Sequence, residues 1–190
     1  MLTNIHQNEY TLLLPEFAKL MYLSHKKYYD LFSNPKESIT KAISDDRSEE
    51  STCQAFFIND TLLGQACFYD SNEIKIRQLF SLKFLNQHTQ IENSTLKVFA
   101  REVPSINKHS LYISRLSIQE ESQKQGFAKQ ILDYIENKAQ KLEYSLLSLH
   151  VDKDNSAAIK LYRKCGFAIN NDKSNYFTMY KKLTKETICT

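Results

Sequence analysis

The chain has 190 residues, of which 42% are hydrophobic and 25% charged, and its formal net charge is +3. The length suits a single domain spanning residues 1–190, and the aromatic content of 12% is too high for a disordered chain. Lysine and arginine form no long run of the kind that marks a nucleic-acid-binding surface, so we expect no nucleic-acid partner.

The cysteines are widely spaced, at Cys53, Cys67, Cys165 and Cys189. Because none of them forms the C-x-x-C spacing of a zinc or redox site, we expect free thiols in a reducing compartment and no bound metal. The N-terminal sequence MLTNIHQNEYTLLLPEF lacks a basic segment and holds only a few consecutive apolar residues. We therefore expect neither a signal peptide nor a membrane span, no membrane partner, and a cytoplasmic protein.

The first elements in chain order are helical. Apolar residues recur at helical spacing over residues 9–29 and again over residues 35–43. The polar run SDDRSEES, residues 44–51, closes this region. Its four acidic side chains could draw in a cationic substrate, but such runs usually form a solvated loop, which we expect here. They are Asp45, Asp46, Glu49 and Glu50.

Two strand-like runs follow, CQAFFI at residues 53–58 and LLGQACFY at residues 62–69. A turn-forming Asn-Asp pair lies between them, so we predict a β-hairpin and assign Gly64 to it. Residues 72–109 begin with the alternation of a strand and continue with the spacing of a helix, so the sequence leaves their structure open.

The C-terminal half alternates strands with helices. LYISRLSI, residues 111–118, alternates apolar and polar residues as a strand does, and the apolar residues of 128–144 share one helical face. A strand over residues 145–151 leads into a short helix over residues 155–164, and two closing strands follow, GFAI and YFTMYKKL. After an antiparallel hairpin, this alternation predicts an α/β fold with a mixed sheet and helices on both faces.

The stretch QKQGFAKQ, residues 123–130, joins a strand to a helix and contains Gly126. A helix that begins there aims unpaired backbone N–H groups and the positive end of its dipole at one point, where an anion can bind. Glycine lets a phosphate approach the backbone closely. The G-x-G-x-x-G and P-loop patterns are absent, which disfavours nucleotide binding of those two kinds. Taken alone, Gly126 is better explained as a residue that eases a strand-to-helix corner.

The segment DKDNSAAIKLYRKCGF, residues 152–167, allows a structural interpretation of each residue. Asn155 can cap the helix, Tyr162 can pack as an aromatic side chain, and Gly166 suits the end of a helix. Cys165 has no histidine near it in the sequence, so we interpret it as structural rather than as a nucleophile.

Together these two segments resemble the GNAT superfamily of N-acetyltransferases. The family's acetyl-coenzyme A motif, R/Q-x-x-G-x-G/A, is matched by Gln123, Gly126 and Ala128. Its later pattern, N-x-x-A-x-x-L-Y-x-K-x-G-F, is matched by Asn155, Ala158, Leu161, Tyr162, Lys164, Gly166 and Phe167. The resemblance is firm over residues 111–183 and does not extend to residues 72–109.

The resemblance implies a single-domain GNAT fold, with a mixed, mostly antiparallel central sheet of six to seven strands flanked by helices on both faces. It also implies acetyl-coenzyme A as the co-substrate, and it is compatible with a homodimer, which family members often form. In the family, the strand equivalent to residues 111–118 diverges from the strand equivalent to 145–151, and the acetyl thioester lies in the gap.

Carried over residue by residue, the resemblance assigns the backbone of Leu116 and Ile118 to the pantetheine arm. The pyrophosphate would be held by a turn whose residues are Gln123, Lys124, Gln125, Gly126, Phe127 and Ala128. Many relatives have glycine in place of Lys124, and a cation there suits the ligand. Asn155 and Tyr162 would face the gap from the following helix.

The resemblance also places Tyr162 near the thioester sulfur, and we predict it as the general acid that protonates the leaving thiolate. Some protein-acetylating relatives have a glutamate just before the valine of the strand equivalent to residues 145–151. Here that position is His150, our candidate general base, which could also be a strand histidine with no catalytic role.

The predicted activity is transfer of the acetyl group of acetyl-coenzyme A to an amine by direct attack in a ternary complex. Two alternatives stay open: a non-catalytic acyl-coenzyme A-binding regulatory module with the same fold, and an unrelated α/β interaction domain. The acceptor, a small molecule or a peptide or protein amine, would be selected by the N-terminal helices and by residues 44–51 and 72–109.

Overall fold

The computed structural model describes residues 3–5, 13–32, 34–86, 106, 109–171 and 175–184. Its strands are β1 (Thr3–Ile5), β2 (Cys53–Ile58), β3 (Thr61–Asp70), β4 (Ser110–Ile118), β5 (Leu146–Asp152), β6 (Ala168–Asn171) and β7 (Tyr176–Lys182). They form one seven-stranded sheet in the order β1-β2-β3-β4-β5-β7-β6. Neighbouring strands are antiparallel except β4 and β5, which are parallel. The predicted mixed, mostly antiparallel sheet is confirmed.

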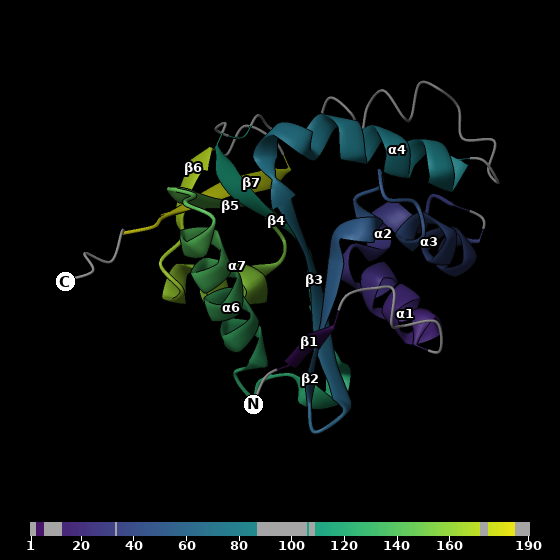
Figure 1. Ribbon diagram of the computed structural model, residues 1–190, viewed down its shortest axis with the longest axis horizontal. Helices are drawn as coiled ribbons and strands as arrows, with labels where there is room; N and C mark the ends of the chain where they lie inside the picture. The colour runs from purple at the N-terminus through teal and green to yellow at the C-terminus, as the bar shows by residue number, and fades with distance from the viewer. Residues whose placement is uncertain are drawn as a thin grey trace.

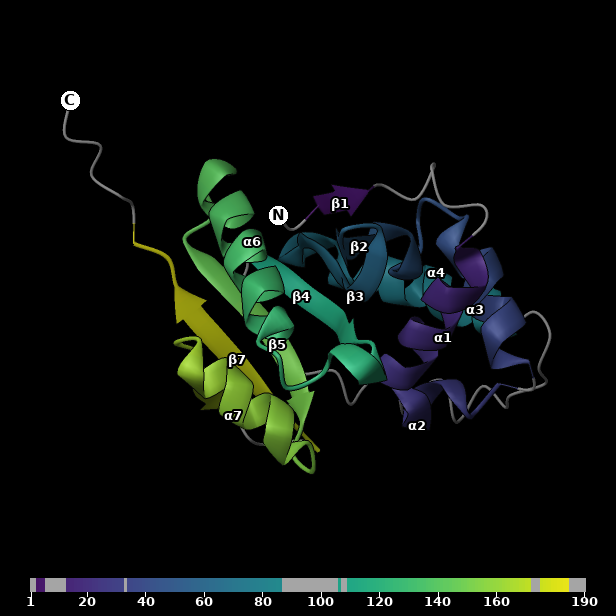
Figure 2. The ribbon, with the colours of Figure 1, turned by 90° about the horizontal axis from the view of Figure 1, so that it is seen from below.

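Helices cover both faces of this sheet, as predicted (Figures 1 and 2). They are α1 (Leu14–Ser24), α2 (Lys26–Tyr29), α3 (Pro35–Ile43), α4 (Ile74–Asn86), α6 (Phe127–Lys141) and α7 (Ser156–Lys164). Helices α6 and α7 pack on one face, and α1 to α3 pack on the other. Among the described residues, no helix combines the length and the apolar composition needed to cross a bilayer.

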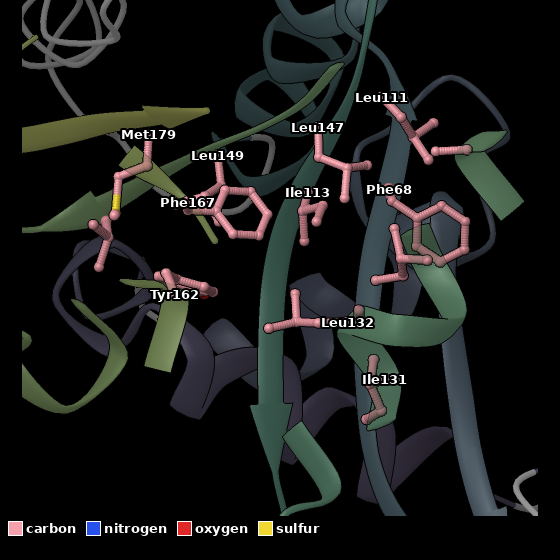
Figure 3. Close-up of a cluster of buried hydrophobic side chains, with 14 of the residues drawn as sticks. Phe68, Leu111, Ile113, Ile131, Leu132, Leu147, Leu149, Tyr162, Phe167 and Met179 are labelled. Atoms are coloured by element: carbon pink, nitrogen blue, oxygen red, sulfur yellow. The ribbon is translucent and has the colours of Figure 1, made fainter. Parts of the chain in front are cut away.

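The strand period of two divides the buried side chains between the two faces. On the α6–α7 face, Leu111 and Ile113 of β4 pack with Leu147 and Leu149 of β5 and with Ile131 of α6 (Figure 3). Fully burying a side chain of this size stabilises the fold by about 1.5–3 kcal/mol. The opposite face buries a second cluster between α1, α3 and the β2–β3 hairpin. The first cluster contains residues of both β4 and β5 and so fixes these two strands against α6 and α7.

In three parts of the chain the structure adds to what the sequence predicts. β1 is too short, at three residues, to give a periodic signal. The helix predicted over residues 9–29 divides into α1 and α2 at His25, whose backbone is not helical, with φ −151° and ψ 55°. Residues 9–12 lie outside the described residues. The open region 72–109 contributes α4, and its residues 87–105, 107 and 108 lie outside the described residues.

Gly64 has a different role from the one that the sequence suggests. The hairpin turn consists of Asn59 and Asp60, both with positive φ, whereas Gly64 lies inside β3. A Cβ at Gly64 would stand 2.3 Å from the carbonyl oxygen of Ser117 and 2.8 Å from Cδ1 of Ile118. Gly64 is therefore required for the close approach of β3 to the end of β4.

We expect Gly64→Ala to destabilise the protein by about 2 kcal/mol, because the new methyl group meets a backbone atom that cannot rotate away. In a chain of this size, that is a decrease in Tm of roughly 4–8 °C. Thermal unfolding followed by circular dichroism measures it, with Thr61→Ala at an exposed position of the same strand as the control. An unchanged Tm in Gly64→Ala would show that the two strands can separate freely.

Candidate active site

The sheet opens between its central strands, β4 and β5 (Figure 2). They pair in parallel over four residues, from Ser110 opposite Leu146 to Ile113 opposite Leu149. Both strands continue past this point, but the described residues of the two strands no longer pair with each other. Backbone groups on the facing edges are left for another partner, and a ligand with amide groups of its own can supply one.

A bulge in β4 follows the last pair with β5. Arg115 and Leu116 together face the single residue Ala66 of β3. Arg115 adopts a left-handed backbone, with φ +53°, at a bulge position that glycine usually occupies. The extra residue places Leu116 and Ile118 against the same α6–α7 cluster that buries Ile113. The bulge thus keeps the end of β4 attached to the core while its direction changes.

β4 leads into a turn that contains most of the predicted cofactor-binding residues. Lys124 and Gly126 have φ of +60° and +87°, and Gly126 is the N-cap of α6. Within the described part of the chain, the backbone N–H groups of residues 124 and 126–128 donate no hydrogen bond. A Cβ added to Gly126 would have no atom within 4 Å, so the space above the turn is open. This arrangement fits an anion such as a pyrophosphate.

Two glutamines brace this turn. Gln123 Nε2 donates to the carbonyl oxygen of Ile118 at 3.3 Å, and Gln125 Nε2 donates to the carbonyl oxygen of Glu121 at 2.8 Å. Both side-chain amides donate to carbonyl oxygens and not to the N–H groups of the turn. They therefore stabilise the shape of the turn and leave its N–H groups available. Phe127 and Ala128 follow as the first half-buried residues of α6.

The second motif forms α7 and both of its ends. Asn155 is the N-cap, and its Oδ1 accepts a hydrogen bond from the backbone N–H of Ala158 at 3.1 Å. This contact accounts for Asn155 as a capping residue. At the other end, Gly166 has φ +88° and the N–H of Phe167 donates to the carbonyl oxygen of Tyr162 at 3.0 Å. The motif therefore specifies a helix that starts and stops at set positions.

Tyr162 is buried, with 8% of its surface exposed. Its ring meets that of Phe167 edge-on, with 5.8 Å between the centroids (Figure 3). Burial, and less strongly the electrostatic effect of Cys165, raises the pKa of Tyr162 to about 12. The phenol is therefore protonated at neutral pH and can act as a proton donor.

His150 approaches the gap from the opposite face of the sheet, because it alternates along β5 with Leu149 and Val151 of the α6–α7 cluster. Its Nδ1 lies 3.1 Å from the hydroxyl of Tyr112 in β4. Burial, then Glu49, and to a smaller extent the neighbouring tyrosines at positions 162 and 176 raise the pKa of Tyr112. The predicted acid and base thus approach the same part of the sheet from its two faces.

The acidic run does not form the solvated loop that the sequence predicts. Glu49 is 1% exposed. Its carboxylate accepts hydrogen bonds from the hydroxyl of Tyr69 at 2.9 Å and from Ser114 Oγ. It also accepts one from Arg115 Nη2 at 3.0 Å. A buried carboxylate persists only when it is paired and hydrogen-bonded in this way.

Glu50 is buried as well, with no exposed surface. Its carboxyl accepts hydrogen bonds from Tyr29 at 3.0 Å and from Ser81 of α4. Burial and the neighbouring Glu49 raise the pKa of Glu50, and Arg115 opposes them. Asp46 remains exposed. The two glutamates of the acidic run therefore belong to the interior of the protein.

His25, at the break between α1 and α2, connects Arg115 to the far side of the gap. Arg115 Nη1 lies 2.7 Å from His25 Nδ1, and a guanidinium can only donate, so Nδ1 is the acceptor. The proton of the neutral imidazole is then on Nε2, which faces the hydroxyl of Tyr176 of β7 at 3.3 Å. Burial, and then Arg115, lowers the pKa of His25 to about 3.

This buried histidine predicts a loss of stability in acid. The unfolded chain takes up a proton on His25 below pH 6.5, whereas the folded protein does so only near pH 3. The free energy of unfolding therefore falls as the pH decreases between these values. At pH 5 it is lower than at pH 7 by up to about 2 kcal/mol. Urea unfolding of wild type and His25→Gln at pH 7 and pH 5 measures the effect. Equal losses in the two proteins would contradict it.

Lys27 makes a second contact across the gap. Its Nζ lies 3.2 Å from Asp152 at the end of β5 and 3.3 Å from Asp154. The α1–α2 segment therefore lies against both sides of the opening between β4 and β5. The sequence does not single out His25, Lys27 or Arg115, because the partners of each are far away along the chain. The one local signal is that the apolar spacing of β4 slips by one residue at Arg115.

Neither a cysteine nucleophile nor a metal centre is evident among the described residues of this site. Cys53 and Cys67 are buried free thiols, Cys165 is a half-buried one, and Cys189 lies outside the described residues. Burial raises the pKa of Cys165, which disfavours a thiolate nucleophile. In the part of the chain that the structure describes, no three His, Cys, Asp or Glu side chains are grouped to hold a metal ion.

Crystal structures of several acetyltransferases share this fold. A protein described as an acetyltransferase has a TM-score of 0.69 and 17% identity, covering 97% of this chain and 100% of its own. An N-acetyltransferase from Staphylococcus aureus Mu50 has a TM-score of 0.66 and 18% identity, covering 96% and 99%. The PaiA N-acetyltransferase from Thermoplasma acidophilum, in complex with coenzyme A, has a TM-score of 0.58 and 15% identity, also covering 96% and 99%.

At these identities the structural likeness concerns the fold. Among curated protein sequences, none matches the chain. The family model of the acetyltransferase (GNAT) family matches residues 17–167, which include the glycine turn and the whole of α7. Because this match covers most of the chain, the chain belongs to the GNAT acetyltransferase family.

Proposed function

We propose that the protein transfers the acetyl group of acetyl-coenzyme A to an amine by direct attack in a ternary complex. The observation that carries the proposal is the turn at Gly126, with free backbone N–H groups and open space above it, at the end of a strand that has separated from its neighbour. The PaiA N-acetyltransferase, whose crystal structure is a complex with coenzyme A, has the same fold.

The chain's own residues supply the binding groups for the co-substrate. The N–H groups of residues 124 and 126–128 would hold the pyrophosphate, and Lys124 adds a positive charge beside it. The backbone of Leu116 and Ile118 would bind the pantetheine amides along the edge of β4 that β5 has left. Asn155 contributes by holding the start of α7 in place.

Tyr162 is the proposed general acid. When the amine attacks the thioester carbonyl carbon, the C–N bond forms, the C–S bond breaks and the thiolate needs a proton. The phenol of Tyr162 is protonated at the pH of the reaction, so it has a proton to give to the thiolate. The attacking nitrogen gives up its second proton to solvent as the amide forms, and the tyrosinate recovers a proton from solvent.

His150 is the proposed general base for the proton that the ammonium acceptor must lose before attack. Its Nδ1 lies 3.1 Å from the hydroxyl of Tyr112, and this contact holds the imidazole in one orientation. His150→Ala tests the assignment. An acidic limb of the pH–rate profile that is the same in this variant would assign the base elsewhere.

A thiol-release assay over a panel of small amines, peptide N-termini and lysine peptides tests the activity, with mass spectrometry to locate the acetyl group. Acceptor-dependent release of coenzyme A is the expected result. A non-catalytic acyl-coenzyme A-binding module would bind acetyl-coenzyme A in calorimetry and release no thiol with any acceptor. Absence of binding would reject both functions.

A further inference from the structure

The bulge at Arg115 combines a strained backbone with an unusually well-anchored side chain. A left-handed backbone costs about 1–2 kcal/mol in any residue with a Cβ, and glycine avoids that cost. Arg115 nevertheless adopts φ +53° in the middle of a central strand. Such a conformation persists when the surroundings hold it, and it tends to occur at functional sites.

The anchor is the buried side chain of Arg115, which extends from β4 into the layer formed by α1 and α2. Only 10% of this side chain is exposed, and its Nη2 pairs with a Glu49 carboxylate that is 2% exposed. Its guanidinium lies over the rings of Tyr28 and Tyr29, 5.2 Å from each centroid. Its Nη1 donates a hydrogen bond to Nδ1 of His25.

Glu49 is in turn fixed from several elements. Its oxygens receive hydrogen bonds from Tyr69 of β3 and Ser114 of β4, and its own backbone N–H donates to Ser81 of α4 at 2.9 Å. The Glu49–Arg115 pair thus joins β3, β4, α1, α2 and α4 at one buried point. Removing one partner would leave an uncompensated buried charge.

The bulge lies where its effect on the gap is largest. The parallel pairing of β4 with β5 ends at Ile113, and the bulge follows at Arg115 and Leu116. β4 then pairs again with β3, with Ser117 opposite Gln65. The bulge therefore sets the direction of the segment from Leu116 to Ile118, which precedes the glycine turn.

We propose that Arg115 is a positioning residue for acyl-coenzyme A: its buried pairing with Glu49 and His25 holds the β4 bulge, and the bulge presents the backbone of residues 116–118 to the ligand. This role rests on the proposed function, since residues 116–118 are the proposed pantetheine site. Arg115 itself faces the α1–α2 layer and acts through the backbone.

Two substitutions separate the anchor from the backbone strain. Arg115→Gly permits φ +53° but removes the anchor, whereas Arg115→Ala removes the anchor and retains the strain. We expect the Kd for acetyl-coenzyme A, measured by calorimetry, to rise about tenfold in Arg115→Gly and further in Arg115→Ala, because the segment loses its preorganisation. In turnover assays KM for acetyl-coenzyme A rises more than kcat falls.

Arg77→Ala is the matched control. Arg77, in α4, pairs with Glu73 at 2.6 Å, lies over the ring of Tyr69 and donates to the carbonyl oxygens of Asp46 and Ser48. Among the described residues, its hydrogen bonds and ion pairs do not reach β4. We expect Arg77→Ala to lower Tm and leave the Kd for acetyl-coenzyme A within about twofold of wild type, because a loss of stability alone does not alter the folded site.

Each outcome decides the proposal. It is overturned by a wild-type Kd in Arg115→Gly, or by an equal rise in Kd in Arg77→Ala at the same loss of Tm. Should the Arg115 variants fail to fold, Glu49→Gln keeps the shape of the partner and removes its charge, and its Kd replaces theirs in the comparison. A wild-type protein that does not bind acetyl-coenzyme A rejects the proposed function itself, which is a different result.

Discussion

Tyr162→Phe is expected to lower kcat about a hundredfold or more while leaving the Kd for acetyl-coenzyme A within about twofold, because it removes only the proton donor. The ring is part of the buried α6–α7 cluster, and phenylalanine keeps the packing against Phe167. Steady-state kinetics together with calorimetry measure the two effects separately. An unchanged kcat would remove Tyr162 from the mechanism.

Tyr144→Phe is the matched control for this experiment. The pKa of Tyr144 is also raised to about 12, chiefly by burial and by its hydrogen bond to Asp70. Its hydroxyl donates to that carboxylate at 2.9 Å, on a different part of the molecule from α7. A raised pKa alone does not make a tyrosine catalytic, so we expect Tyr144→Phe to retain kcat.

The raised pKa of Tyr162 also predicts the shape of the pH–rate profile. A general acid works in its protonated form, so its contribution persists below its pKa and is lost as the pH rises through about 12. A falling limb between pH 8 and about 10 therefore has to come from another group. If such a limb disappears in Tyr162→Phe, the ligand-bound site lowers this pKa substantially.

Gly126→Ala is expected to raise the Kd for acetyl-coenzyme A by about tenfold or more, through two effects. The methyl group enters the open space above the turn, where the pyrophosphate is proposed to lie. The left-handed backbone, φ +87°, also costs an alanine about 1–2 kcal/mol, which acts on stability and on the shape of the turn. Calorimetry and thermal unfolding report the two effects.

Gly166→Ala separates the ligand effect from the strain. Gly166 has φ +88°, and its added Cβ would meet the flexible Lys181 side chain at 3.4 Å. The backbone strain is thus similar, but the position ends α7 and lies outside the turn. We expect similar losses of Tm in both variants and a normal Kd in Gly166→Ala. A normal Kd in Gly126→Ala as well would reject the turn as the pyrophosphate site.

The sequence predicts the elements whose signals are local. α6 and α7 are legible because their apolar faces, capping residues and terminal glycines lie within a few residues of one another. The hairpin is equally legible from the Asn-Asp pair between two alternating runs. These are the elements that surround the glycine turn, and this is why the cofactor side of the candidate site can be proposed from sequence.

The buried contacts between β4 and the α1–α2 layer depend on distant parts of the chain. The sequence around Glu49 is typical of a protein surface. Its buried partner, Arg115, lies 66 residues further along the chain. His25 has its partner Tyr176 at a separation of 151 residues. Patterns of periodicity and spacing do not reveal contacts between residues that are this far apart. For that reason the sequence predicts a solvated loop where the structure buries two glutamates. The bulge did leave a trace, because the apolar positions Ile113 and Leu116 are three residues apart where a regular strand has two.

The short pairing between β4 and β5 also bears on how the molecule folds. The pairs join residues 110–113 to residues 146–149 across an intervening helix, whereas the β2–β3 hairpin joins near neighbours. Closing the loop between β4 and β5 costs more chain entropy than closing the hairpin, and the four residue pairs between β4 and β5 offset only part of that cost. We expect the β2–β3 hairpin to form before β4 pairs with β5, so the gap between β4 and β5 takes shape after the hairpin during folding.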